Sequence, residues 1–204
     1  MAMLLDPNMQ RSSSFLHLKS FLASPIDYVF SRWQSAKSHG VARWGRPESL
    51  HDDWVERTAL IAGMIQPNSS ILEFGAGKER LREFLPQGCR YQPADIIARS
   101  TNTIVADLNV TTPKLTEKYD YIVFSGVLEY IHDVQKLLHY VRDNCTTCIL
   151  SYAPTDCLEC MTTRMRSGWV NHLSKNSFES ILHNAGFEIL EKRVWRGQDI
   201  YSLR

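Results

Sequence analysis

The sequence lacks a long hydrophobic run, because no apolar stretch approaches the roughly 20 residues that a membrane-spanning helix needs. Its first residues, MAMLLDPNMQR, also lack the basic start and long apolar stretch of a secretory signal. Internal repeats and low-complexity tracts are missing as well. These absences predict a cytoplasmic protein with no membrane span.

An excess of one charge is also missing. Lysine and arginine number 23 and aspartate and glutamate 22, so the net charge is about +1. A protein that binds duplex nucleic acid needs a basic excess to neutralise phosphates, and we therefore expect no duplex partner. One local basic group, Arg32, Lys37, Arg43 and Arg46, is either a solvated face or an anion site.

The chain has five cysteines, and four of them form two C-x-x-C pairs, Cys145 with Cys148 and Cys157 with Cys160. This spacing is typical of zinc sites. However, the residues between the pairs, ILSYAPTD, read as a buried strand, which rises about 3.3 Å per residue. The pairs would then lie at opposite ends of the strand. We expect reduced structural thiols and no metal, with a zinc site as the alternative.

The residues that are present predict one α/β domain. The chain has 204 residues, of which 44% are apolar, and this suits one domain with a sizeable core. Apolar patterns predict strands over 69–74, 90–96, 103–108, 119–126 and 147–152, and helices over 78–85, from the fourth strand to about 143, and over 177–185. The last two predicted strands, 187–195 and 199–204, are joined by a short turn. Strands that alternate with helices predict a mostly parallel sheet, and the final hairpin adds an antiparallel edge strand.

The N-terminal part has a different pattern. Apolar residues over 15–33 have helical spacing, interrupted by Pro25, and predict a helical extension that packs on the main domain. A loop rich in Gly, Pro and Arg follows, and another helix is expected to begin near Ser49. We therefore divide the chain into an N-terminal extension, 1–48, and a main domain, 49–204.

The most informative stretch is ILEFGAGKER, residues 71–80, in which a predicted strand ends in two closely spaced glycines. In an open α/β sheet, ligands bind beyond the carboxyl ends of the strands. A dinucleotide site would favour a further glycine at position 80, which is Arg80. The Glu73 carboxylate is also unfavourable beside a pyrophosphate but favourable beside an ammonium or a hydroxyl. A different nucleotide is therefore indicated, with a simple strand-to-helix turn as the alternative.

Four motifs in order resemble class I S-adenosylmethionine-dependent methyltransferases, over roughly residues 50–204. They are Glu73-Phe74-Gly75-Ala76-Gly77, Ala94-Asp95-Ile96, Ala106-Asp107-Leu108 and YDYIVFSGVLEYIHD, which spans 119–133. The sequence departs from the family where Glu79 replaces the third glycine.

The resemblance implies a Rossmann-like, doubly wound, mostly parallel seven-stranded sheet with a C-terminal antiparallel hairpin. It implies S-adenosylmethionine as the cofactor and S-adenosylhomocysteine as the product. It places Asp95 at the ribose hydroxyls and Asp107 beside the adenine. The full expected cofactor-binding set is Glu73, Phe74, Gly75, Ala76, Gly77, Asp95, Ile96, Asp107, Leu108, Ser125 and Gly126.

The acceptor is less closely defined. The balanced charge and the lack of an Asn-Pro-Pro-Tyr type motif favour a small-molecule or glycan acceptor, methylated at oxygen. A hydroxyl acceptor needs a base, and Glu129 and His132 are preferred over Tyr130 and His172. From the N-terminal side, Trp44, Arg46 and Arg57 are candidates for closing the site. Methylation of a protein or RNA, and a cofactor-binding scaffold without turnover, are the alternatives.

Overall fold

The structure is a computed structural model that describes residues 41–157 and 161–204. The chain divides into two units, Met1–Ser38 and His39–Arg204, and the described residues all belong to the second. The helix predicted over 15–33 lies outside the described residues.

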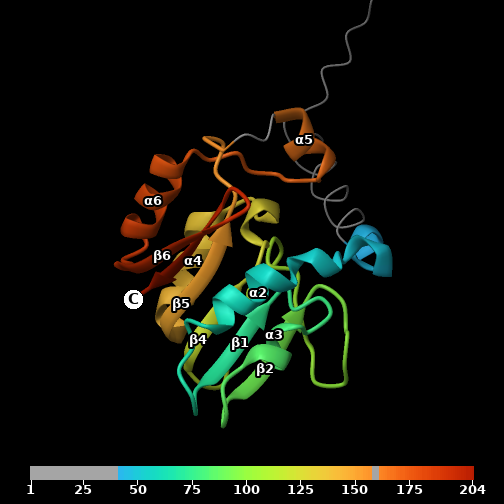
Figure 1. Cartoon of the computed structure of the whole chain (residues 1–204), viewed down its shortest axis with the longest axis vertical. Helices are drawn as coiled ribbons and strands as arrows, with labels where there is room; N and C mark the ends of the chain where they lie inside the picture. Colours follow the sequence, from blue (N-terminus) through green and yellow to red (C-terminus); the bar gives the residue numbers. More distant parts are fainter. Residues whose placement is uncertain (1–40, 158–160) are drawn as a thin grey trace, which may run out of the picture. The chain divides into compact units, whose positions relative to one another are not determined.

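A seven-stranded sheet forms the centre of the domain (Figure 1). Its order is β3-β2-β1-β4-β5-β7-β6, where β1 is Ser70–Phe74, β2 Arg90–Asp95, β3 Ile104–Val105, β4 Tyr119–Phe124, β5 Cys145–Tyr152, β6 Ile189–Trp195 and β7 Gln198–Leu203. The first five strands are parallel, whereas β7 pairs antiparallel with β5 and with β6. The predicted fold class, including the C-terminal hairpin, is confirmed.

Helices cover both faces of the sheet. On one face, α2 (Val55–Ala62) and α3 (Leu81–Phe84) pack through Ile61 and Leu81 against Ile71, Val123 and Ile149 of the strands. On the other face, α4 (Val134–Asn144) and α6 (Lys175–Asn184) contribute the second apolar core. Because both faces are covered, β1 is buried along its whole length, including its polar residues Ser70 and Glu73.

Short elements complete the domain: the 3-10 helices η1 (Pro47–Ser49), η2 (Asp52–Trp54) and η3 (Leu128–Tyr130), and the helix α5 (Met161–Arg166). The helix predicted after β4 is therefore divided into η3 and α4. Asp133 separates the two, and its side chain caps α4 by accepting the Lys136 N–H at 2.9 Å.

The helix expected to begin near Ser49 begins only at Val55, because Pro47–Ser49 and Asp52–Trp54 form separate 3-10 helices before it. Two further predicted elements were too long. The helix predicted over 78–85 is wrong for its first turn, because Glu79 has a left-handed φ of +55° and α3 begins only at Leu81. The strand predicted over 103–108 is reduced to Ile104–Val105, because β3 pairs with β2 at only two positions. Both corrections concern segments at the carboxyl ends of strands, where the chain leaves regular structure.

The register of the parallel strands decides which residues meet beyond the sheet. Phe74, the last residue of β1, pairs with Ala94 on β2 and with Phe124 on β4. The residues that follow these three positions, Gly75, Asp95 and Ser125, therefore lie at neighbouring strand ends. The strand order reverses between β1 and β4, which is where ligands bind in folds of this kind.

Candidate active site

The turn after β1 is shaped by glycine. Gly75 has a φ of +69° and Gly77 a φ of +51°, and L-residues with side chains rarely adopt this region. A Cβ atom at position 75 would also lie 2.4 Å from Cγ2 of Val127, which follows β4. The turn therefore requires the absence of a side chain at position 75, as the sequence motif predicted.

Asp95 lies against this turn. Its Oδ2 accepts the N–H of Gly77 at 2.8 Å and its Oδ1 accepts the N–H of Ile97 at 3.0 Å. The backbone N–H of Ala106 donates to the carbonyl of Asp95 at 2.9 Å, which brings the β3 end beside the β2 end. Each carboxylate oxygen has two lone pairs, so the buried Asp95 can still accept hydrogen bonds from a ligand.

The remaining predicted cofactor residues surround the same strand ends. Asp107, which is half-buried, accepts the N–H of Asn109 with its carboxylate, and Leu108 packs against the core. Phe74 and Ala76 are buried and Ile96 is half-buried. The structure thus brings the predicted residues of β1, β2 and β3 together, while their contacts with a cofactor stay a prediction.

Glu73 lies beneath the turn rather than at its surface. It is 4% exposed and accepts a short hydrogen bond from the hydroxyl of Tyr91 on β2. Burial raises the pKa of Glu73 to about 8, despite the opposing effect of the Tyr91 hydrogen bond. At neutral pH the carboxyl is therefore mostly protonated, and the ligand-facing role expected from the sequence stays a prediction.

Glu79 stands where the family has its third glycine. Its φ of +55° is of the kind that glycine adopts most easily. Its Oε1 is buried and has no hydrogen-bond partner within the described residues, while Oε2 lies 3.8 Å from Nη1 of Arg82. The backbone of the motif is thus kept although the glycine is not.

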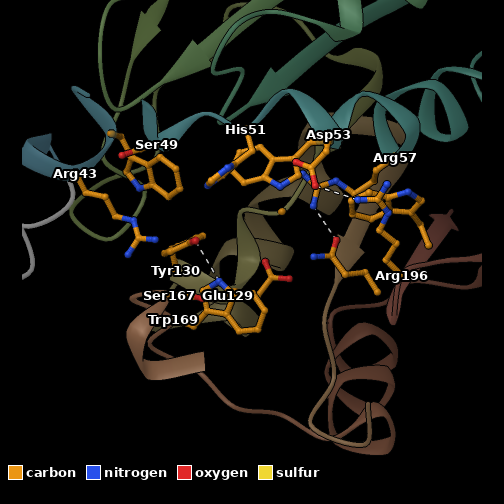
Figure 2. Close-up of a pocket in the computed structure, with 15 residues that line it drawn as sticks. Arg43, Ser49, His51, Asp53, Arg57, Glu129, Tyr130, Ser167, Trp169 and Arg196 are labelled. Atoms are coloured by element: carbon orange, nitrogen blue, oxygen red, sulfur yellow. Dashed lines mark hydrogen bonds and ion pairs between the residues drawn. The ribbon is translucent and has the colours of Figure 1, made fainter. Parts of the chain in front are cut away.

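A pocket of about 360 Å³ opens next to the turn, at the carboxyl ends of β4 and β5 (Figure 2). Four of the five tryptophans of the chain line it. The full lining is Arg43, Trp44, Ser49, His51, Asp53, Trp54, Arg57, Gly126, Glu129, Tyr130, Ser167, Trp169, Trp195, Arg196 and Gln198. Five aromatic and five charged side chains make up most of the lining, and a concave pocket of this size suits a small molecule with polar or charged groups.

Arg57, from α2, connects three parts of the pocket. Its Nε donates to Ser125 Oγ at 3.0 Å, its Nη1 to Gln198 Oε1 at 2.7 Å and its Nη2 to the carbonyl of Ser125 at 3.2 Å. A Cβ atom at Gly126 would lie 2.7 Å from Nη1, so the glycine lets the guanidinium lie directly on the backbone. Burial lowers the pKa of Arg57, and the nearby Glu129 opposes that shift.

Glu129, from η3, is fully buried in the wall of the pocket. Its Oε1 accepts the N–H of Ala153 at 2.9 Å, whereas Oε2 has no hydrogen-bond partner among the described residues. Burial raises the pKa of Glu129, while the charges of Arg57 and Arg164 act to lower it. A buried carboxylate oxygen without a partner in a pocket wall is a candidate ligand contact.

The two predicted histidines lie outside the pocket lining. His132 is exposed, and its backbone N–H donates to Asn109 Oδ1 at 2.9 Å. His172 accepts from Nε of Arg164 at 3.3 Å, and burial followed by the Arg164 charge lowers its pKa. Of the predicted bases, Glu129 and Tyr130 line the pocket and the histidines do not.

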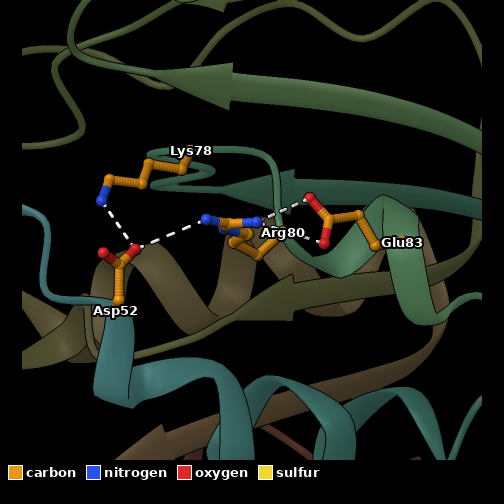
Figure 3. A network of polar contacts seen from close by, with 4 residues as sticks. All are labelled: Asp52, Lys78, Arg80 and Glu83. Atoms are coloured by element: carbon orange, nitrogen blue, oxygen red, sulfur yellow. Dashed lines mark hydrogen bonds and ion pairs between the residues drawn. The ribbon is translucent and has the colours of Figure 1, made fainter.

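The segment 41–54 closes the site from the N-terminal side. The carbonyl of Trp44 accepts from Arg99 Nη2 at 2.6 Å, and Leu50 lies 3.3 Å from a Cβ atom placed on Gly77. Asp52 binds Lys78 at 2.7 Å and Arg80 at 3.4 Å, just beyond the glycine turn (Figure 3). Trp44 and Arg57 lie in the lining and their role in closing the site stays a prediction, whereas Arg46 is exposed and outside the lining.

Several lining residues were missed from the sequence. Trp169 follows α5, and Trp195, Arg196 and Gln198 belong to the terminal hairpin, which the sequence indicated only as a sheet edge. The available signal was the tryptophans themselves, five in 204 residues, because tryptophan combines a large apolar area with an N–H donor and is enriched at binding surfaces. Which of these residues come together depends on the order of the strands in the sheet, so it could not be predicted from any short stretch of the sequence.

The cysteines are placed largely as expected. Cys145 and Cys148 lie in β5 and are buried, and Cys157 follows the strand; Cys160 lies outside the described residues. Burial raises the pKa of Cys145 to about 12 and that of Cys148 well above its ordinary value, so both stay protonated. Within the described residues, no group of three or more metal-ligating side chains comes together.

Comparison with known families gives a match to the methyltransferase domain over residues 45–192. The match covers the glycine turn, the strand ends beside it and most of the pocket lining. No curated protein matches the chain significantly. Among the described residues, none of the helices has both the length and the apolar character that a bilayer crossing requires.

Solved methyltransferase structures share the fold. An O-methyltransferase from neocarzinostatin biosynthesis, NcsB1, solved with S-adenosylmethionine and 2-hydroxy-5-methyl naphthoic acid, is 15% identical with a TM-score of 0.62, over 88% of this chain and 62% of that chain. The 1,6-didemethyltoxoflavin-N1-methyltransferase of Burkholderia thailandensis, solved with S-adenosylhomocysteine, is 18% identical with a TM-score of 0.58. The match covers 90% of this chain and 91% of that chain. The N-terminal domain of EvdMO1, solved with S-adenosylhomocysteine and D-fucose, is 18% identical with a TM-score of 0.52. The match covers 75% of this chain and 82% of that chain.

Proposed function

The chain belongs to the methyltransferase domain family, as a class I S-adenosylmethionine-dependent methyltransferase, and from this premise we propose that it methylates a small molecule or glycan at oxygen. The observation that carries the proposal is the pocket of about 360 Å³, which begins at Gly126 beside the glycine turn. A pocket of this size, with aromatic walls, suits a small acceptor better than a folded macromolecule.

The residues at the strand ends fit the cofactor. Asp95 offers buried oxygens to ribose hydroxyls, and the left-handed turn at Gly75 leaves its backbone free of side chain. Arg57 carries five N–H donors and uses three of them on protein acceptors, which leaves two for a carboxylate. When bound, S-adenosylmethionine supplies a methyl group that its sulfonium already activates, so the protein mainly aligns the acceptor with it.

Glu129 is the proposed base. A hydroxyl acceptor has to give up its proton when it is methylated, and Glu129 Oε2, an oxygen in the pocket wall without a hydrogen-bond partner in the described residues, would take that proton. A raised carboxyl pKa brings the group closer to the working pH, which favours proton transfer. His132 remains the alternative base and lies outside the lining.

The cofactor site is tested by calorimetric titration with S-adenosylhomocysteine. We expect Asp95→Ala to weaken binding at least tenfold, about 1.4 kcal/mol, because the ribose loses its acceptor. Asp95→Asn keeps an acceptor for the Gly77 N–H and should lose less, and the exposed Asp143→Ala is the matched control. Equal affinity for wild type and Asp95→Ala would refute the assigned role.

The base is tested by the pH dependence of methyl transfer once an acceptor is in hand. Glu129→Gln keeps an oxygen for the Ala153 N–H but cannot take a proton. We expect the rate to fall by about 10²–10⁴-fold and to lose its rise with pH across the Glu129 pKa. A Glu129→Gln enzyme with a normal pH profile would transfer the role to His132, for which His132→Gln is the parallel variant.

A further inference from the structure

Arg43 is fixed in the pocket by packing. Its guanidinium carbon lies 5.2 Å from the centre of the Trp44 ring and 6.0 Å from that of Tyr130. On another side, a Cβ atom at Gly168, where φ is +73°, would lie 2.7 Å from Nη1 of Arg43. A side chain at position 168 would therefore displace the guanidinium, which lies close to the backbone there. An arginine held in this way loses little further freedom when it binds a ligand.

The three arginines of the pocket lining differ in their partners. Arg57 donates to Ser125 and Gln198, and Arg196 pairs with Asp53 at 3.0 Å and with Glu56 at 2.9 Å. Arg43 has only its aromatic contacts within the described residues, without a hydrogen bond or a carboxylate partner there. Within the part of the chain that the structure describes, Arg43 is thus the lining arginine that pairs with no protein acceptor, whereas Arg57 keeps only two N–H groups and Arg196 is paired.

The charge balance around Arg43 favours an anion. The lining holds three arginines and two acids, and one of the acids, Asp53, pairs with Arg196. The other acid, Glu129, lies between the charges of Arg57 and Arg164. Tyr130 lies between Arg43 and Glu129 (Figure 2), so the excess positive charge and the proposed base are at different positions along one wall.

We propose that the acceptor carries an anionic group, a carboxylate or a phosphate, which the Arg43 guanidinium binds while the acceptor hydroxyl faces Glu129. This inference rests on the proposed methyl transfer and adds a substrate class to it. A planar fork of N–H donors suits both groups, because each offers two oxygens at the right spacing for a bidentate contact. A bidentate contact with Arg43 would therefore favour acidic acceptors over neutral ones such as an unmodified sugar.

The test measures binding of matched small probes to the full chain saturated with S-adenosylhomocysteine. The probes are 4-hydroxybenzoate with its uncharged mate 4-hydroxybenzamide, and phenyl phosphate with phenol, titrated by calorimetry up to about 10 mM. We expect at least one anionic probe to bind tenfold or more tightly than its mate, and the two pairs separate carboxylate from phosphate recognition. Equal binding within both pairs, or no binding by either anion, would overturn the proposal.

The variant Arg43→Gln tests whether the preference for anionic probes depends on Arg43. The matched control is Arg46→Gln, because Arg46 is an exposed arginine outside the lining. We expect Arg43→Gln to lose the preference for the anion while Arg46→Gln keeps it. A preference that survives Arg43→Gln, or that both variants lose equally, contradicts the role of Arg43. Melting temperatures of both variants guard against misfolding.

Cofactor binding by the same samples separates this inference from the proposed function. Wild-type protein that does not bind S-adenosylhomocysteine would refute the proposed function itself. If wild type and Arg43→Gln bind S-adenosylhomocysteine equally and the probes reveal no charge preference, only the acidic-acceptor inference fails. Loss of S-adenosylhomocysteine binding in Arg43→Gln alone would assign Arg43 to the cofactor and overturn the inference.

Discussion

The glycine turn and the pocket lie side by side at the same edge of the sheet, yet they are built in different ways. The turn is formed by consecutive residues, Gly75 to Gly77, and its shape depends on backbone angles and on one carboxylate, Asp95. The pocket is formed by side chains from 43 to 198 in the sequence, which meet only because the strands and helices bring them together.

Because of this difference, substitutions can change the acceptor specificity more easily in the pocket than in the turn. A backbone turn tolerates few substitutions, and the cofactor contacts proposed for this turn would be the same for any acceptor. The pocket walls come from the segment 41–54, from η3, from the residues after α5 and from the β6–β7 hairpin, so each wall can change separately. Functional side chains on segments positioned by a rigid sheet commonly vary in this way.

The pocket should be most sensitive to loss of Arg57, the side chain that joins its parts. Arg57→Met leaves Ser125, Gln198 and the buried Glu129 without their polar or charged neighbour. We expect a loss of about 3 kcal/mol in the free energy of unfolding, measured by urea denaturation.

Two variants control this prediction. Arg57→Lys keeps the charge but not the planar fork, and it should fall between wild type and Arg57→Met. Arg193→Met removes a half-buried arginine outside the pocket, which donates to the Leu60 carbonyl, and should cost less. A smaller loss for Arg57→Met than for Arg193→Met would mean that Arg57 does not hold the pocket together.

The turn should be most sensitive to a side chain at position 75. Gly75→Ala adds a Cβ atom in a left-handed conformation and 2.4 Å from Val127, so we expect a loss of about 2 kcal/mol in urea denaturation. Gly186→Ala is the matched control, because φ there is +83° but a Cβ atom meets nothing within 4 Å. If both substitutions cost the same, the close approach of Val127 has no energetic consequence.

The smallest expected effect is a gain. Glu79→Gly removes a left-handed glutamate and a buried oxygen that lacks a partner in the described residues, and should add about 1 kcal/mol to stability. Asn68→Gly is the control at a φ of +59°, where asparagine is already tolerated and little gain is expected. A destabilised Glu79→Gly protein would indicate that the Glu79 side chain supports the turn.

The sequence was most informative where structure is local. Mainly apolar segments between helical patterns predicted the strands around the site, because the strands of a parallel sheet that is covered on both faces are mostly buried. The end of α6 is also local in this sense, because Gly186, which follows the C-cap residue Ala185, has the left-handed φ of +83° that glycine adopts easily. The short β3 and the turn over 78–80 were not predictable, because the ends of these elements depend on pairing with β2 and on the unusual φ of Glu79.

By itself, therefore, the sequence determined the fold class and the residues of the glycine turn, because backbone conformation and apolar periodicity are written into neighbouring residues. Only the tertiary structure decided that Glu73 faces Tyr91 in the interior, that His132 lies outside the pocket and that Trp169, Trp195 and Gln198 line it. These placements follow from the order and register of the strands, which fix which distant side chains share one cavity.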